Sequence, residues 1–321
     1  AKVFLDRAIG FNSVDDKYYQ AKSQVHLVAL NRIVAKAAAG SKEDLSGQFR
    51  SELAEAVKSA KSAVDLNSSN AQNWFGLGQV YESAIPYNIA NADKSALDAY
   101  DRARGNDPSN PIFPLAIARV HVTNADLLTL QINQTSSGDQ RSRLEQVRKE
   151  YLAKAKEALN MAVSLKPDFA GAHFLLAQAA IRENNIQEAI RSTAATARLA
   201  PGDIGVAFQL GVLYYRADEL DNAKAEFERA ILINDNYSNA RYFLGLIWDR
   251  KNDQDGALSQ FQKIAALNPD NEEVKKIIAN LETGKRALEG IVPPAPAPEK
   301  RKEAPVKENG KKSEPAPVKR R

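Results

Sequence analysis

The chain has 321 residues, of which 44% are hydrophobic and 26% are charged, the ordinary balance of a folded protein in water. Cysteine is absent, which excludes disulfides, thiolate metal sites and cysteine nucleophiles, and no run approaches the ~18 consecutive apolar residues of a membrane span. The formal charge of +4 reflects a basic end, so net charge does not indicate a broad nucleic-acid-binding face.

Residues 1–69 are predicted to form divergent helices at the start of the chain. The opening VFLDRAIGFNS has the spacing of a helix from a hairpin repeat, and Ala56, Ala60 and Ala63 share one face of a later helix. Because the sequence begins at Ala1 and not at methionine, we expect a fragment or a processed form whose first repeat is truncated.

Residues 70–270 are predicted to form an array of repeats. An aromatic residue and an arginine eight positions later recur three times at an interval of 34 residues, and a fixed period of about 20–50 residues is typical of repeat arrays. The first complete unit reads W-x2-L-G-x2-Y, followed by A-x3-aromatic-x2-A-x4-P. The repeat positions are occupied by Trp74, Leu77, Gly78, Tyr81, Ala96 and Pro108, then by Leu210, Gly211, Tyr214, Ala223 and Phe227, and then by Leu244, Gly245, Trp248, Ala257, Phe261 and Pro269.

The spacing of these residues predicts two antiparallel helices in each unit. Leucine and tyrosine four positions apart share one face of a helix, and the alanines and the aromatic residue of the second motif do the same. Glycine and alanine at the contact let the two backbones approach closely, and the proline after the second helix ends it. Each unit is therefore expected to be a helical hairpin that packs on its neighbours.

This motif resembles the tetratricopeptide repeat (TPR). The resemblance implies an all-α protein, an α-α superhelix of TPR-like helical hairpins. It also implies a protein-interaction function, in which the concave groove of the superhelix binds a peptide or a partner domain.

Two insertions are predicted within the array, at about residues 82–95 and 122–146. Pro86 indicates a break between the two helices of the first affected unit. In the second insertion, TSSGDQ is typical of a loop, and the charged stretch after it predicts a long second helix that begins near Ser142.

The chain is predicted to end in a capping helix over residues 271–290 and a disordered tail over 291–321. The cap has apolar residues on one face and charges on the other, as the end of a solenoid requires. The tail is rich in proline, lysine and arginine, so it cannot bury enough apolar area to offset the entropy of ordering. Three interpretations of it stay open: a solubilising end, a contact with nucleic acid or anionic membrane, and a ligand for a proline-recognising domain.

No arrangement of residues in the sequence indicates catalysis, a metal site or a cofactor. His26, His121 and His173 lie in separate units without metal-ligand spacing, and the sequence has no phosphate-binding glycine motif and no nucleophile elbow. A packed histidine is the commoner explanation for each. We therefore expect a protein that is not an enzyme.

The TPR resemblance also implies a set of partner-binding residues. In that family the residue after the tryptophan position faces the concave groove, as do residues four and eight positions further on. Aromatic rings and fixed cations at these places would contact an extended or helical peptide. Carried over, the candidate groove residues are Phe75, Gln79, Phe174, Gln178, Arg182, Phe208, Arg216, Tyr242 and Arg250.

A packing explanation competes with this one. Aromatic residues at helical spacing usually belong to the core, and arginines near a helix C-terminus are favoured by the helix dipole and by unsatisfied carbonyls. The lysine and asparagine with which some TPR proteins bind chaperone C-termini are replaced here by aromatic, amide and aliphatic residues. Chaperone docking is therefore not expected.

The amino-acid sequence of the repeats, as in NWFGLGQVYE and NARYFLGLIWD, also resembles the TPR regions appended to bacterial O-antigen-ligase-like membrane proteins. Two functions are therefore predicted. The first is a non-enzymatic protein–protein interaction scaffold, and the alternative is a soluble assembly or regulatory module of such a membrane glycan-processing protein. The identity of the partner, self-association and the compartment stay open, the last being cytoplasmic or membrane-attached through residues upstream of Ala1.

Overall fold

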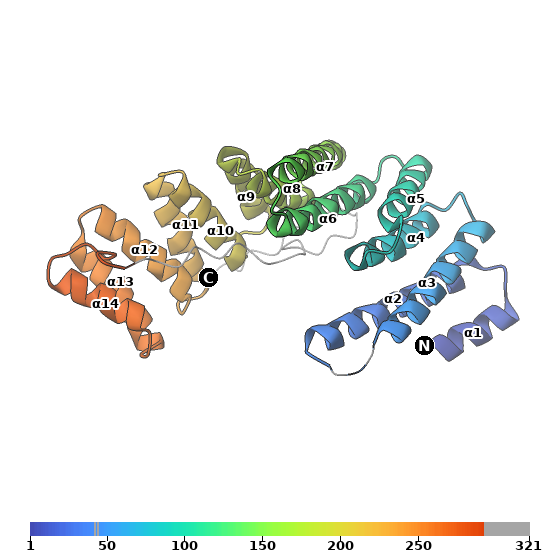
Figure 1. Cartoon of the computed structure of the whole chain (residues 1–321), viewed down its shortest axis with the longest axis horizontal. Coiled ribbons are helices and arrows are strands. Elements are labelled where there is room, and N and C mark those ends of the chain that lie inside the picture. The colour runs from blue at the N-terminus through green and yellow to red at the C-terminus, as the bar shows by residue number, and fades with distance from the viewer. Residues whose placement is uncertain (42, 44, 292–321) are drawn as a thin grey trace, which may run out of the picture. The chain divides into compact units, whose positions relative to one another are not determined.

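The protein is an all-α solenoid of helical hairpins (Figure 1), which confirms the predicted fold class. The structure is a computed structural model that describes residues 1–41, 43 and 45–291. The predicted disordered tail lies outside the described residues from position 292 onward. Within the described ranges, no helix is both long and apolar enough to cross a lipid bilayer.

The chain divides into two compact units, Ala1–Phe169 and Ala170–Arg321. The first contains α1 (Lys2–Phe11), α2 (Asp16–Ala38), α3 (Ser46–Leu66), α4 (Ala71–Ala84), the short 3₁₀ helix η1 (Ile85–Tyr87), α5 (Ala92–Asn106), α6 (Ile112–Gln134) and α7 (Gly138–Leu165). The second contains α8 (Ala170–Arg182), α9 (Ile186–Leu199), α10 (Ile204–Arg216), α11 (Leu220–Ile233), α12 (Ser238–Arg250), α13 (Gln254–Leu267) and α14 (Glu272–Glu282).

Consecutive helices pack in pairs. The hairpins are α2–α3, α4–α5 and α6–α7 in the first unit, and α8–α9, α10–α11 and α12–α13 in the second. The second helix of a hairpin also packs on the first helix of the next one, as α3 does on α4 and α9 on α10. Within each unit a hairpin therefore buries its apolar face against its neighbours, which is the packing of a solenoid.

A glycine in the first helix allows the two helices of a hairpin to come together. Each repeat glycine faces the aromatic ring of the second helix, and a Cβ at that glycine would lie too close to the ring for any real contact. The distance from such a Cβ to the nearest ring atom would be 2.5 Å for Gly78 and Tyr100, 2.7 Å for Gly211 and Phe227, and 2.6 Å for Gly245 and Phe261.

The turn between the helices of a hairpin repeats with the same 34-residue interval. Asn184, Asp218 and Asn252 each adopt the left-handed conformation, with φ of 56°, 63° and 60°. Asparagine and aspartate tolerate this region better than other residues with a side chain. The side chains of Asn185 and Asp253 then cap the following helix by accepting a backbone N–H three residues on.

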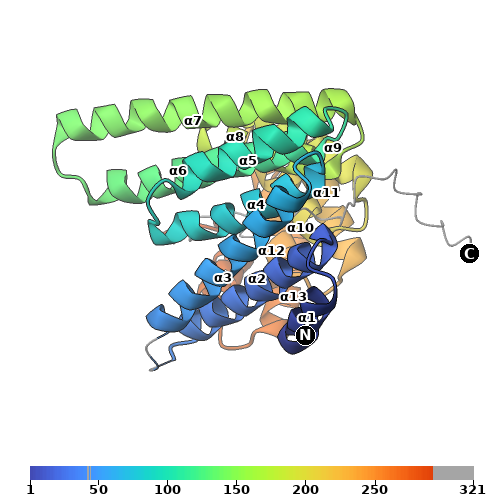
Figure 2. The same ribbon diagram turned by 90° about the vertical axis from the view of Figure 1, so that its right-hand side faces the viewer.

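The two predicted insertions have different structures. In the first, α4 ends at Ala84, the 3₁₀ turn containing Pro86 follows, and α5 begins at Ala92. In the second, both helices are extended: α6 continues to Gln134 and α7 begins at Gly138, before the predicted start near Ser142. The loop expected there is only residues 135–137, and Figure 2 shows the two long helices side by side up to it.

The last helix of the described residues is α14, which packs on α13. Asn271 caps its N-terminus by accepting the backbone N–H of Val274. Val274, Ile277 and Leu281 are buried against the preceding hairpin, and Glu272, Lys275, Lys276 and Glu282 are exposed. This polar outer face is the feature that the end of a solenoid requires.

Candidate interaction surface

The predicted aromatic stripe lies on the first helices of the hairpins, and the rings of Phe75 and Phe208 pack against the next hairpin. Phe75, Phe208 and Tyr242 are half-buried, whereas Phe174 is 7% exposed and belongs to the core. The rings contact residues of the following hairpin or helix, as the packing explanation predicts. Ring centroids lie 5.6 Å apart for Phe75 and Phe113, 5.4 Å for Phe208 and Tyr237, and 5.6 Å for Tyr242 and Phe261.

Tyr242 is held by its hydroxyl as well as by its ring. The hydroxyl donates a hydrogen bond of 2.8 Å to Oε1 of Glu273, at the start of α14. Burial, and then the hydrogen bond and negative charge of Glu273, raise the pKa of the Tyr242 hydroxyl far above its usual value. The group therefore stays neutral at physiological pH and fixes the capping helix to α12.

Two arginines of the stripe connect their hairpin to the turn of the preceding one. Nη2 of Arg216 donates a 2.9 Å hydrogen bond to Oδ1 of Asn184, and Nη2 of Arg250 forms a 2.6 Å ion pair with Asp218. Arg182 donates a hydrogen bond of 3.1 Å to the carbonyl of Gln178 on its own helix. Asn184 and Asp218, the left-handed residues that bind Arg216 and Arg250, are therefore also 34 positions apart.

Arg216 and Arg250 differ in their electrostatic surroundings. Arg250 faces a carboxylate, and its guanidinium carbon also lies 5.4 Å from the ring centroid of Tyr215. Arg216 bonds to a neutral amide, so that hydrogen bond restricts its position without cancelling its charge. Both side chains are exposed at the end of their helices.

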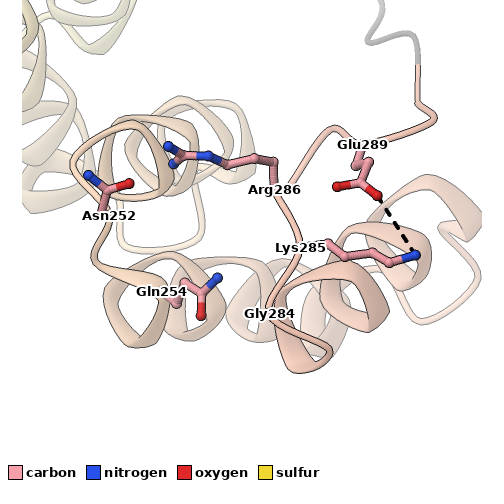
Figure 3. A pocket seen from close by; sticks show the side chains of 6 residues that line it. All are labelled: Asn252, Gln254, Gly284, Lys285, Arg286 and Glu289. Atoms are coloured by element: carbon pink, nitrogen blue, oxygen red, sulfur yellow. Dashed lines mark ion pairs between the residues drawn. The ribbon is translucent and has the colours of Figure 1, made fainter.

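A similar arrangement occurs at the end of the second unit, beside a cavity of about 370 Å³ (Figure 3). Arg286 extends toward the turn that contains Asn252 and donates a hydrogen bond to the backbone carbonyl of Asp249. Lys285 and Glu289 form an ion pair across 3.8 Å at the other side of this cavity. The spacing from Arg250 to Arg286 departs from 34, so the sequence period alone did not reveal this contact.

Two of the predicted groove residues, Phe75 and Gln79, lie beside residues of α2. Gln79 accepts a 3.1 Å hydrogen bond from Nε2 of Gln24, and Phe75 and Gln79 line one small pocket with Gln20 and Ser23. Sequence reasoning missed the α2 residues because that unit departs from the repeat motif. The signal available was the spacing of Gln20 and Gln24, which lie one turn apart on a single helix face.

The chain belongs to the tetratricopeptide repeat family, because a model of that family matches residues 49–111, 144–204 and 208–272, more than half of the chain. The hairpins, the glycine contacts and the 34-residue interval described above are the physical basis of that match. A comparison with curated proteins gives no match.

Several solved structures are similar to this chain. YrrB, described as a TPR protein with an unusual peptide-binding site, is 20% identical with a TM-score of 0.43, over 75% of this chain and 97% of its own. The MamA protein is 21% identical with a TM-score of 0.46, over 65% and 96%. PilF of Pseudomonas aeruginosa is 16% identical with a TM-score of 0.44, over 81% and 99%. Similarity at this level says nothing about a shared ligand.

Proposed function

We propose that this protein is a non-enzymatic scaffold that binds a peptide or a partner domain along the first helices of its hairpins. TPR arrays as a class are protein-interaction scaffolds. In the second unit the first helices are α8, α10 and α12, and they carry the candidate rings and cations at equivalent positions. The rings supply rigid apolar walls between hairpins, and the exposed arginines supply charge at the helix ends.

The observation that carries this proposal is the state of Arg216. Its guanidinium is exposed and is positioned by the turn of the preceding hairpin through a neutral partner, Asn184. A cation that is already restricted loses little conformational entropy when a ligand carboxylate binds it. We infer that Arg216 is an anchor for an acidic group of the ligand, whereas Arg250 is already paired with Asp218.

A random peptide library selected on the immobilised full chain tests the proposal. We expect enrichment of peptides that contain an acidic residue. Arg216→Gln keeps a hydrogen-bond donor near Asn184 but removes the positive charge. It is expected to weaken binding of these peptides about tenfold, because a charge-assisted hydrogen bond is lost.

The matched control is Lys263→Gln, which removes one positive charge from an exposed position on α13, a second helix. Its affinity for the same peptides is expected to equal that of the unaltered chain. Equal losses of peptide affinity in the two variants would show that only net charge matters. The absence of any enriched peptide would contradict the scaffold proposal. Nothing in the described residues favours the membrane-module alternative, which stays a prediction.

A further inference from the structure

A small pocket with both polar and apolar walls lies between α2 and α4 in the first unit. Its volume is about 160 Å³. Four glutamines line it, Gln20 and Gln24 from α2 and Gln72 and Gln79 from α4, with Ser23 between the first two. Among the described residues that form its wall none carries an ionisable side chain.

Ser23 provides an unused hydrogen-bonding group in this pocket. The residue is only 2% exposed, and its Oγ has no hydrogen-bond partner among the described residues. A serine inside a helix commonly bonds to the carbonyl one turn earlier, and buried hydroxyls nearly always have a partner. Within the described part of the chain, the Ser23 hydroxyl is therefore left without a partner at the wall of the pocket, and an entering group reaches it only when neighbouring side chains shift.

The glutamines of the pocket are positioned by hydrogen bonds among themselves and to α4. Nε2 of Gln24 donates to Oε1 of Gln79 at 3.1 Å. Gln20 donates to Asn73, whose own amide is fixed by a 2.8 Å hydrogen bond to Asp16. Each glutamine amide has both donor and acceptor atoms. Gln20 therefore keeps its side-chain oxygen as an acceptor for a ligand, and Gln79 keeps its side-chain nitrogen as a donor.

Gly76 keeps the pocket open. A glycine within a helix lowers its stability, and at Gly78 the nearby ring of Tyr100 explains the cost. No such reason exists at Gly76, where a Cβ would meet no atom within 4 Å. Gly76 lines the pocket, and the later repeats fill the corresponding position with Leu175, Gln209 and Phe243.

We propose that this pocket binds the primary amide side chain of an asparagine or glutamine in a peptide ligand. A primary amide donates and accepts hydrogen bonds at once, which matches the Ser23 hydroxyl and the glutamine amides. A carboxylate only accepts and an ammonium only donates, and either would place a charge in a pocket without a counter-ion. The inference rests on the proposed function, since it names the side chain that one end of the binding surface selects.

A titration of the ¹⁵N-labelled full chain with N-acetyl-glutamine methylamide tests the pocket directly. We expect saturable shifts of the side-chain amide signals of Gln20, Gln24 and Gln79, and the asparagine analogue should give the same. N-acetyl-glutamate methylamide at pH 7 is expected to bind at least tenfold more weakly. Equal binding of the glutamate analogue, or no shift with the amides, would overturn the proposal.

Two substitutions at one position provide a matched pair. Gly76→Leu places a side chain in the pocket and is expected to abolish the amide-specific shifts, while Gly76→Ala adds only a Cβ and should retain them. Circular dichroism checks that both variants remain helical. Ser23→Ala should lower the affinity for the amide probe at least threefold, both in the unaltered chain and in Gly76→Ala. Retained binding in Gly76→Leu would contradict the location.

The outcomes separate this inference from the proposed function. The probe is a single amino-acid derivative that does not involve Arg216, which is in the other unit. Failure of the amide titration with the Arg216 effect intact would overturn the pocket alone. Amide binding without enrichment of any peptide would retain the pocket and contradict the peptide-binding scaffold.

Discussion

At the scale of residues, the two glycines of α4 show how one sequence feature has two causes. Gly78 faces the ring of Tyr100 at a distance that no Cβ permits, so its hydrogen is part of the packing of the hairpin. Gly76, two positions earlier, points away from that contact and meets nothing. Gly78 is required where a ring faces it, whereas the repeat motif places no such demand on Gly76.

Alanine substitution at the two positions is expected to change stability in opposite directions. Gly78→Ala forces the ring of Tyr100 to shift and should lower the free energy of unfolding by about 1–3 kcal/mol, the usual cost of overpacking. Gly76→Ala should raise it by up to ~1 kcal/mol, because alanine favours the helix and meets no obstacle. Urea unfolding followed by circular dichroism measures both, and destabilisation by Gly76→Ala would show that the space beside it is not open.

At the scale of elements, the long hairpin α6–α7 places a histidine in an apolar contact. His121 of α6 is 8% exposed and its ring centroid lies 5.9 Å from that of Tyr151 on α7. Burial, and then the positive charge of Lys154 on α7, lower the pKa of His121 below its usual value, and Asp93 and Asp101 of α5 and Glu157 of α7 oppose this only in part. Protonation is therefore more favourable in the unfolded chain than in the folded one.

The stability of the protein is expected to fall as the pH drops below about 6.5, the ordinary pKa of histidine. Above that value His121 is neutral in both states and contributes no pH dependence. Below it the unfolded chain takes up the proton first, so the free energy of unfolding decreases. His121→Gln should remove this part of the slope between pH 7 and 5. Urea titrations at several pH values compare the two chains, and identical slopes would contradict the assignment to His121.

At the scale of the whole molecule, stability is expected to be distributed over units that respond separately. Each hairpin packs mainly on its neighbours, so a local defect lowers stability nearby and has less effect far along the array. The two compact units, Ala1–Phe169 and Ala170–Arg321, are the natural boundaries for such a response.

Hydrogen exchange on two core variants tests this. Phe261→Ala removes a fully buried ring of α13 and should lower protection in α12–α14 while α3–α5 keep theirs; Phe113→Ala, equally buried in α6, should do the reverse. Truncation of a buried phenylalanine typically costs about 3–5 kcal/mol, enough to be resolved locally. A uniform loss of protection over the whole chain in both variants would indicate one cooperative unit.

Much of the fold could be predicted from the sequence because the contacts that define a hairpin are close in the chain. Gly211 and Phe227 are sixteen positions apart, within one 34-residue period, so the spacing of residues encodes their contact. The candidate site was predicted less completely. Its aromatic residues were placed on the right helices, but the motif could not tell that their rings pack between hairpins or that Phe174 is buried.

Contacts between hairpins had no comparable signal. Glu82 of α4 accepts a hydrogen bond from Tyr100 of α5 and two bonds of 2.8 Å from Arg119 of α6, a set that spans 37 positions. An acidic residue near a helix end is common on solvated surfaces, so nothing in the local pattern distinguished Glu82. In the second insertion the polar stretch TSSGDQ was expected to be a loop before a helix that begins near Ser142, whereas α6 continues to Gln134 and α7 begins at Gly138.

The sequence by itself determined that this protein is a TPR array, since periodic glycine, alanine and aromatic positions specify helical hairpins that stack on one another. Tertiary structure alone decided what the remaining side chains do. It gave Arg216 a neutral partner and Arg250 an acidic one, and it brought Gln20 and Ser23 to a pocket beside Gln79. The physical reason is range: hairpin formation depends on neighbours within one period, whereas charge compensation and pocket formation depend on residues that only the stacking of hairpins brings together.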